Sequence, residues 1–395
     1  MKKEFFWVAP VTAILSLLAS IEVIAHDFEL DVAVGLDSNP NKLTKTLDLD
    51  NGGYGLGRIE FSHMPTRTGY YYQLEGRSDI YKTGEETTVE SNSEHLNGKA
   101  ELGFKWRPKN KYGRSKYKWE INYNTKDSIF VDRSSGDVPI FNGEPVGERF
   151  DAVWVGFDFS GTIPISEEAE FIFNLDFKNK EYESYEDIGL SNLNYKQVNL
   201  DVGFEKEIWS KVFLKTMIGY SKRVYEDRRA REKNKTLIPD TDLEYSYLEA
   251  INAIEYRFAK RWKFEIGLDV DQRQDNEKGY YDSTQAKLIT RLRYRNSDYV
   301  KFLLSARYLK RRYDEIGEDP AVGSIVTPGG VDEEELEKSR EGVRVRAEFI
   351  RRLVSQGPLT LDLIMGLEYD TFENSNPVFS YDRGQTYVGL RWTPY

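Results

Sequence analysis

Most of the chain alternates between apolar and polar residues with a period of two. In the stretch from Leu30 to Leu36 the even positions are apolar, and Asp31, Ala33 and Gly35 lie between them. Such alternation predicts β-strands that have one apolar and one polar face. Many of the runs reach about nine residues or more, the length that a tilted strand needs to cross a bilayer.

Sixteen segments follow this pattern along the chain. They lie at roughly 28–36, 54–64, 68–81, 95–106, 115–124, 150–160, 168–178, 196–206, 211–223, 245–258, 262–273, 283–295, 299–311, 342–353, 358–370 and 384–393. The pattern is weakest at 54–64, where its phase changes, and at 245–258. The sequence therefore predicts an all-β chain with about sixteen antiparallel strands.

The connections between these segments alternate in length. The short ones are 65–67, 107–114, 161–167, 207–210, 259–261, 296–298 and 354–357, and the long ones are 38–53, 82–94, 125–149, 179–195, 224–244, 274–282, 312–341 and 371–383. Short periplasmic turns and long external loops are typical of closed transmembrane barrels, in which an even strand count returns both termini to the periplasm. A soluble β-sandwich is the alternative, but it needs no such alternation because it buries its apolar faces between two sheets.

The first 25 residues have the pattern of a secretory signal peptide. Lys2 and Lys3 precede an apolar run, and Val23, Ile24 and Ala25 form a small-residue cleavage site. We expect cleavage near Ala25, so that residues 26–395 form the mature domain. An uncleaved anchor helix is the alternative, although the apolar run is short for a spanning helix.

The amino-acid composition excludes several kinds of catalytic and metal-binding site. The chain has 395 residues, no Cys, three His and a net charge of −11, which removes thiol catalysis and Cys-based metal sites and argues against a nucleic-acid partner. The glycine-rich run at 53–57 has no helix behind it to form a phosphate cradle. We therefore expect no enzyme activity, no metal site and no cofactor. A chain that is 14% aromatic and 31% charged suits a barrel with a wet interior and an apolar exterior.

The features above resemble a Gram-negative outer-membrane β-barrel of the porin-like kind. The closing residues 387–395 form an amphipathic strand with Val388, Leu390 and Trp392 in phase and Tyr395 one step out of phase. The resemblance implies that Trp392 or Tyr395 is the aromatic signal read by the barrel-assembly machinery. The opening residues 35–41 also resemble the first strand and loop of barrels found with exopolysaccharide genes.

The polar phase of the strands predicts a charged lumen, because a sixteen-stranded barrel is wide enough to hold water. One side is basic and the other acidic, and this segregation would select charged solutes; chance segregation in a merely polar lumen is the alternative. The basic track consists of Lys287, Arg291, Arg293, Arg295, Lys301, Arg307, Arg311, Arg344 and Arg346, and the acidic side of Glu170, Asp176, Asp201 and Glu205.

The long connection 125–149 is a candidate constriction loop. It combines apolar residues such as Ile129, Phe130 and Ile140, which are costly in an exposed loop, with several glycines and prolines that favour turns. Its acidic residues are Asp132, Asp137, Glu144 and Glu148. An acidic loop facing the basic track would resemble a porin eyelet, whereas a packed external lid is the alternative.

These observations favour a passive porin-like channel for hydrophilic, charged solutes or saccharides in the bacterial outer membrane. An export conduit for an anionic exopolysaccharide and a non-conducting structural or adhesive barrel are the alternatives. The expected partners are outer-membrane lipid, the barrel-assembly machinery and a small hydrophilic solute or polysaccharide, and a homo-oligomer is left open.

Overall fold

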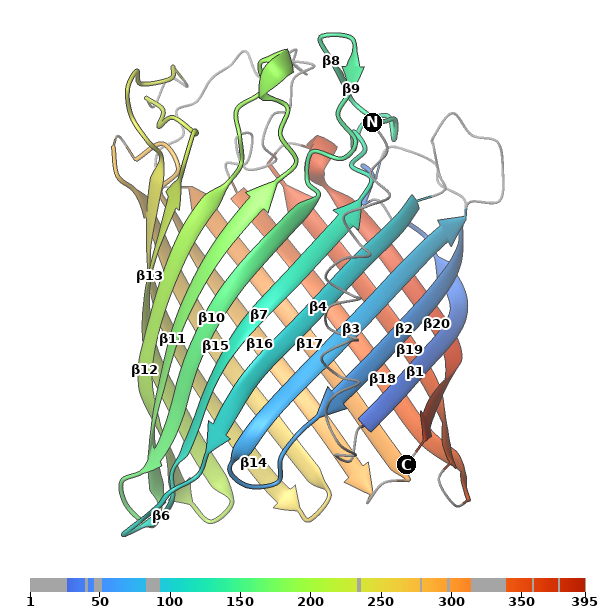
Figure 1. The fold of residues 1–395 in the computed structure, drawn as a ribbon, viewed down its shortest axis with the longest axis vertical. Coiled ribbons are helices and arrows are strands. Elements are labelled where there is room, and N and C mark those ends of the chain that lie inside the picture. The colour runs from blue at the N-terminus through green and yellow to red at the C-terminus, as the bar shows by residue number, and fades with distance from the viewer. Residues whose placement is uncertain are drawn as a thin grey trace.

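A computed structural model describes residues 27–39, 42–45, 52–82, 93–232, 236–277, 279–296, 299–313, 339–356, 359–375 and 377–394. Sixteen long strands pair in sequence order, and the first pairs with the last to close one antiparallel barrel (Figure 1). They are β1 (Asp27–Asp37), β2 (Gly52–His63), β3 (Gly69–Lys82), β4 (Ser93–Trp106), β7 (Lys116–Ser128), β10 (Ala152–Pro164), β11 (Ala169–Tyr182), β12 (Tyr195–Trp209), β13 (Val212–Tyr225), β14 (Glu244–Ala259), β15 (Trp262–Asp275), β16 (Ser283–Asn296), β17 (Val300–Tyr313), β18 (Ser339–Gln356), β19 (Leu359–Asn374) and β20 (Tyr381–Pro394).

The strand count and the closed barrel confirm the prediction from the alternation, including the two weakest segments, which form β2 and β14. The signal peptide, Tyr395 and most of the connection 312–341 lie outside the described residues. Several strands are longer than predicted: β7 and β11 end at Ser128 and Tyr182, four residues beyond 124 and 178. The apolar alternation stops where outward residues such as Asp127 of β7 and Glu181 of β11 are charged, although the backbone pairing continues.

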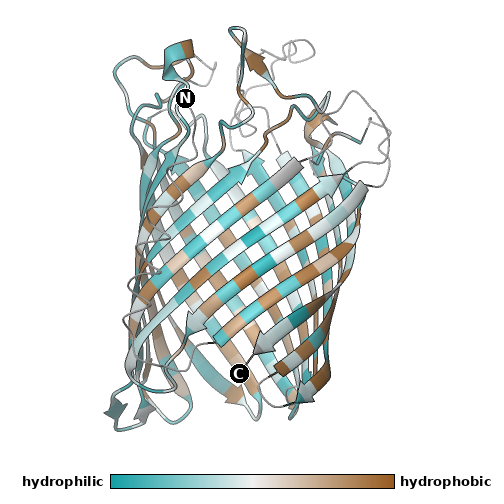
Figure 2. Cartoon of the chain, turned by 45° about the vertical axis from the view of Figure 1, so that its right-hand side comes forward, coloured by the Kyte–Doolittle hydropathy of each residue, from teal (hydrophilic) through white to brown (hydrophobic). Residues whose placement is uncertain are grey.

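Alternate residues of each strand face opposite sides of the barrel wall. On β1 the outward residues Val32, Val34 and Leu36 are 55%, 63% and 56% exposed, whereas the inward Asp31 and Asp37 are 3% and 0% exposed. Figure 2 shows the same alternation as apolar and polar bands around the barrel. An apolar exterior on a closed wall is the arrangement of an outer-membrane β-barrel, and it excludes a sandwich of two sheets. Among the described residues, no helix combines the length and apolar composition needed to cross a bilayer.

Short turns lie at one end of the barrel and long loops at the other. The short-turn end carries the two-stranded hairpin of β5 (Lys109–Asn110) and β6 (Gly113–Arg114), together with the register shifts between β12 and β13, β14 and β15, and β18 and β19. The long-loop end carries the hairpin of β8 (Ile140–Phe141) and β9 (Glu144–Pro145) and the 3-10 helices η2 (Glu186–Ile188) and η3 (Pro377–Phe379). The hairpin turn uses positive φ angles at Asn142 and Gly143, 49° and 88°, the conformation that an Asn-Gly pair favours.

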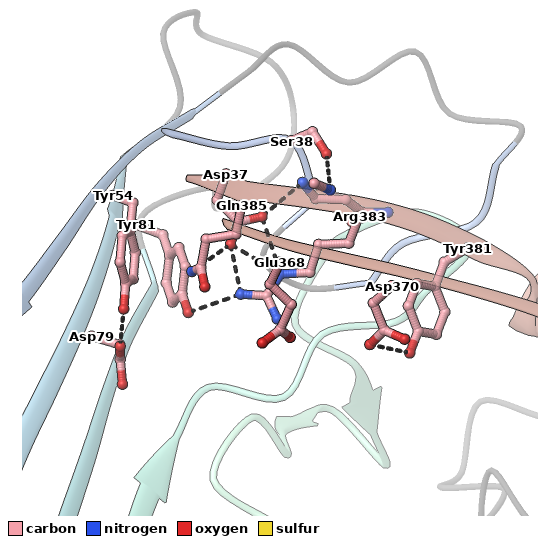
Figure 3. Close-up of polar contacts among 12 residues, drawn as sticks. Asp37, Ser38, Tyr54, Asp79, Tyr81, Glu368, Asp370, Tyr381, Arg383 and Gln385 are labelled. Carbon is pink, nitrogen blue, oxygen red and sulfur yellow. Dashed lines mark hydrogen bonds and ion pairs between the residues drawn. The ribbon is translucent and has the colours of Figure 1, made fainter. Parts of the chain in front are cut away.

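Inner-face polar contacts join β1 to β20 at the seam where the barrel closes (Figure 3). The guanidinium of Arg383 donates to the Asp37 carboxylate at 2.6 and 2.9 Å, and the Gln385 amide donates to it at 3.0 Å. Further along the seam, Arg391 donates twice to Asp31 at 2.8 Å. The seam is therefore held by charged hydrogen bonds as well as by the backbone ladder.

The opening motif around Asp37 anchors the first loop to the last strand. Ser38 accepts a hydrogen bond from the Gly384 amide at 2.7 Å. The side-chain amide of Asn39 donates to the Leu43 and Asp382 carbonyls at 2.9 and 3.1 Å. These short polar residues thus have a structural role at the closure of the barrel.

Apolar packing inside the barrel is concentrated at the long-loop end. Inward-facing Tyr195, Tyr225 and Tyr245 form a buried cluster with loop residues. The loop residues of this cluster are Ala230, Leu243, Tyr280 and Tyr281. These four residues of the connections after β13 and β15 therefore pack against the inward-facing rings and narrow this end of the lumen.

Candidate functional site

The strand register brings the predicted basic residues together on the inner face of β16, β17 and β18. Arg307 of β17 lies directly opposite Arg344 of β18, and Lys301 lies opposite Arg295 of β16. All nine predicted residues share the phase that points away from exposed apolar residues such as Leu288 and Leu304. The alternation therefore placed these side chains on one stretch of the lumen wall.

Carboxylates from the neighbouring strands neutralise the edges of this basic track. Lys287 lies 3.1 Å from Asp271 of β15, and Arg291 forms an ion pair with Glu265 of the same strand. At the other edge, Arg344 pairs with Asp370 of β19. The sequence analysis missed these partners, although Asp271, Glu265 and Asp370 lie in the polar phase of predicted strands.

The centre of the track keeps more of its positive charge. Within the described residues, no carboxylate lies within ion-pair distance of Lys301, Arg307 or Arg311; the Arg311 guanidinium donates instead to the Gln285 amide oxygen at 3.1 Å. Arg346 pairs with Glu348 of its own strand at 2.8 Å. The positive field of this wall therefore comes mainly from β17.

The predicted acidic residues also lie side by side on the inner face. Glu170 of β11 is directly opposite Glu205 of β12, and Asp201 is opposite Asn174. Asp176 accepts a hydrogen bond from Asn199. Glu120, Asp158, Glu249 and Asp269 share this inward phase, so the acidic side runs from β7 to β15.

The connection from β7 to β10 has two parts with different directions. Its base reaches toward the seam between β1 and β20, where the Arg133 carbonyl accepts from the Thr44 amide at 2.9 Å and the guanidinium lies 5.7 Å from the ring of Tyr381. The β8–β9 hairpin projects away from the barrel (Figure 1), and Ile140 on it is 60% exposed. The expected burial of the apolar loop residues is wrong for Ile140, whereas Val131, a further apolar residue of the same connection, is 5% exposed.

The four acidic loop residues do not gather at the mouth. Glu144 lies on the projecting hairpin, and Asp137 and Glu148 are exposed. Asp132 closes a local turn by accepting hydrogen bonds from the amide and hydroxyl of Ser134. The charged side chain that this connection brings to the cavity at the mouth is Arg133.

A cavity of about 440 Å³ lies under the base of this connection at the long-loop end. No Asp or Glu is among the described residues that line it. Its cationic lining residues are Lys42, Lys126, Arg133, Lys180, Arg223 and Arg228, and its aromatic lining residues are Phe130, Phe150, Tyr182, Tyr195 and Tyr225. We call it the loop-end cavity.

Aromatic faces hold several of these cations in place. Arg223 lies 4.5 Å from the ring of Tyr195 and donates to Gln197 at 2.9 Å. Lys180 lies 4.5 Å from the ring of Tyr182. Cation–π contacts of this kind stabilise a cation without neutralising it, so the cavity keeps its positive charge. In the sequence, the signal was the pairing of Lys or Arg with Tyr two residues away at the loop ends of strands, as in Lys180 and Tyr182.

The pKa of Lys42 reflects its burial among these cations. Burial lowers its pKa to about 8, with a further lowering from Arg344, Arg383 and Arg133 and an opposing effect from Asp370. Because Lys42 belongs to the first loop, its pKa depends on how closely the loops pack around it. The Lys42 ammonium also lies 5.4 Å from the ring of Tyr381.

The residues that a metal would need are not gathered in the part of the chain that the structure describes: it has no group of three or more His, Cys, Asp or Glu placed to hold an ion. The predicted assembly residue Trp392 faces outward and packs edge-on against Phe28, with ring centroids 5.5 Å apart. Tyr395 lies outside the described residues.

No family model and no curated protein matches the chain. Among solved structures, OccD3 (OpdP) of Pseudomonas aeruginosa is 10% identical, with a TM-score of 0.44 and coverage of 94% of this chain and 92% of that one. OccAB3 of Acinetobacter baumannii is 10% identical with a TM-score of 0.42 (94% and 99% coverage), and a bacterial polysaccharide outer membrane secretin is 9% identical with a TM-score of 0.41 (93% and 97% coverage). The fold assignment rests on the strand pairing of the chain itself.

Proposed function

We propose that the chain is a passive outer-membrane channel for hydrophilic, anionic solutes, with the long loops outside the cell. The observation that carries this proposal is the loop-end cavity, which has six cationic lining residues and no acidic one among the residues described there. A cleft lined by one sign of charge attracts solutes of the opposite sign and raises their local concentration. The cationic centre of β17 continues this attraction into the lumen.

The direct test is ion selectivity in planar bilayers. In the variant Lys126→Gln with Lys180→Gln, the cavity loses two charges from strand positions, and the reversal potential in a salt gradient should shift away from anions. The shift should be larger at 0.01 M than at 0.1 M salt, where the Debye length falls from about 30 to about 10 Å. An unchanged reversal potential would contradict the proposed role of the cavity.

The matched control is Lys196→Gln with Lys222→Gln. These lysines lie at the same end of the barrel but on the outward phase, where they pair with Glu226 and Glu244 at 2.8 and 2.7 Å. Removing them should leave the selectivity unchanged. A barrel that inserts but never conducts would favour the non-conducting structural alternative.

Export of an anionic polysaccharide is the second candidate. The five aromatic side chains that share the loop-end cavity with its cations support it, because ring faces suit sugar rings while Arg pairs with carboxylates. Block of the ion current by an oligouronate at concentrations where a neutral oligosaccharide of equal length has no effect would favour this candidate over a channel for small anions.

The membrane orientation has its own test. Cys introduced at Asn142, on the projecting hairpin, should be labelled on intact cells, and Cys at Asn110, on the β5–β6 turn, should not. The reverse labelling pattern would place the long loops in the periplasm and contradict the proposed direction of entry.

A further inference from the structure

A second cationic cavity lies at the opposite end of the barrel, and the proposed solute path does not yet account for it. It has a volume of about 180 Å³ and lies against the inner face of β4, β7, β10 and β11 at the short-turn end. Its charged lining residues are Lys105, Arg107, Lys116 and Lys118, and no acidic residue is among those described that line it. We call it the turn-end cavity.

The positive charges of this cavity are crowded. Lys105 is directly opposite Lys118 in the β4–β7 register, and their ammonium groups lie 5.0 and 5.2 Å from the same ring, that of Tyr71. Like charges at opposed strand positions cost free energy unless water, salt or a ligand compensates. The arrangement therefore favours a bound anion.

Only one of these cations has a carboxylate partner in the part of the chain that is described. Lys118 pairs with Glu120 at 2.6 Å. The Lys105 ammonium contacts the Met64 sulfur at 3.1 Å, and the Arg107 guanidinium donates to the Thr66 carbonyl at 2.6 Å. Lys105, Arg107 and Lys116 thus keep their charge for a ligand.

Neutral hydrogen-bond donors complete the cavity. The hydroxyl-bearing Ser160 and Thr162 of β10 and the amide-bearing Asn174 of β11 line it beside the lysines. Cationic and neutral donors around a small hollow suit a compact oxyanion, whose several oxygens each accept hydrogen bonds. The small volume favours a single phosphoryl or diphosphoryl group over an extended polymer.

We infer that the turn-end cavity binds the phosphate or diphosphate group of a small solute. The inference rests on the proposed anion channel, in which this cavity is a second binding position after the loop-end cavity. The acidic stretch of the wall around Asp158 and Asp176 lies between the two, so a phosphorylated solute would pass from one cationic position to the other along the β16–β18 side of the lumen.

Calorimetric titration of inorganic pyrophosphate into the detergent-solubilised barrel tests this inference without conduction. Lys126→Gln and Lys180→Gln are introduced first, so that the loop-end cavity contributes less binding. In that background, Lys105→Gln with Lys116→Gln should weaken pyrophosphate binding about tenfold, as expected from removing two exposed charge contacts. Lys105→Arg with Lys116→Arg should retain binding because the charge is kept.

The matched control is Lys109→Gln with Lys111→Gln, which removes two exposed charges from the β5–β6 turn at the same end but outside the cavity. Equal weakening by the control and by the cavity variant would show a general charge effect and overturn the inference. Absence of pyrophosphate binding before the cavity lysines are changed would also overturn it.

Block of the ion current by pyrophosphate provides a second measurement. In bilayers with known orientation, pyrophosphate added on the short-turn side should reduce the current of wild-type channels. The same reduction is expected for the variant Lys126→Gln with Lys180→Gln, in which the loop-end cavity is altered. A barrel that binds pyrophosphate through Lys105 and Lys116 but does not conduct supports the inference and overturns the channel. If the barrel conducts and is anion-selective, but its pyrophosphate binding is unchanged when these lysines are replaced, the inference is overturned and the channel proposal stands.

Discussion

The seam between β1 and β20 and the basic track of β16–β18 both consist of charged side chains on the inner face, but they differ in burial. At the seam, the Asp37 and Arg383 side chains are 0% and 12% exposed. On the track, the Arg291 and Arg346 side chains are 38% and 47% exposed. The same alternation of polar residues therefore encodes two roles: buried pairs close the barrel, and water-facing charges shape the field in the lumen.

This difference in burial predicts different energetic roles. Removing one partner of a buried ion pair leaves an uncompensated charge and typically costs about 3–5 kcal/mol. An exposed pair contributes about 0–1 kcal/mol. Substitutions at the seam should therefore change stability, and substitutions on the track should change selectivity.

The largest effect is expected for Asp37→Ala. The change leaves the Arg383 guanidinium without its carboxylate inside the wall, and Gln385 loses an acceptor. We expect a loss of about 3–5 kcal/mol in the free energy of unfolding, measured by urea titration of the refolded barrel. Adding Arg383→Ala should recover part of the loss, because the double variant has no unpaired charge. A double variant that is less stable by the full sum of both single losses would contradict this pairing.

The next largest effect is expected at Trp392, on the outer face of the same seam. Trp392→Ala removes the ring that packs against Phe28, and an aromatic pair contributes about 0.5–1.5 kcal/mol beyond its buried area. We expect less heat-modifiable barrel in the membrane fraction, because the closing strand loses its outward aromatic contact. Normal membrane levels of Trp392→Ala together with low levels of Tyr395→Ala would assign the assembly signal to Tyr395 instead.

The seam also marks the limit of what the sequence predicts. Alternation identified all sixteen strands, because the lipid-facing side chains must be apolar wherever the wall meets the bilayer. The pairing of Asp37 with Arg383, 346 residues apart, needs the closed ring and its register, which a period of two leaves undefined. Glu265 and Asp370 were missed as partners of the basic track for the same reason.

The loops were less predictable than the wall. Apolar content predicted that the connection 125–149 packs, but its direction depends on contacts with Thr44 of the first loop and Tyr381 of β20, which are distant in the sequence. The loop-end cavity is formed by six cations from different strands and loops, and no local motif marks such an assembly in a single sequence. Its trace in the sequence is the pairing of basic residues with tyrosines at the loop ends of strands.

The track should respond in the opposite way to the seam. Arg307→Gln with Arg311→Gln removes two charges that have no carboxylate partner within ion-pair distance in the described part of the chain. We expect stability to change by less than about 1 kcal/mol and anion preference to fall, more steeply at low salt. Lys310→Gln, on the outward phase of the same strand, is the control. If the variant is stable and its reversal potential is unchanged, the basic track does not lie along the permeation path.

The smallest effect is a pH dependence at Lys42, which lies where the two regions meet. Its surroundings carry Asp370 and Arg344 from the track side and Arg383 from the seam, together with Arg133 from the loop above. Burial lowers the Lys42 pKa from its usual 10.5 to about 8, so the ammonium is charged at pH 7 and largely neutral at pH 9. The folded barrel then binds fewer protons than the unfolded chain between about pH 8 and 10.5, so this group's contribution to stability rises with pH across that window.

Because Lys42 loses its charge between pH 7 and 9, the anion preference of the wild type should fall over this range. Lys42→Gln should remove most of this change in the reversal potential. The same pH dependence in both proteins would show that another group titrates, and that Lys42 does not contribute to the field at the mouth.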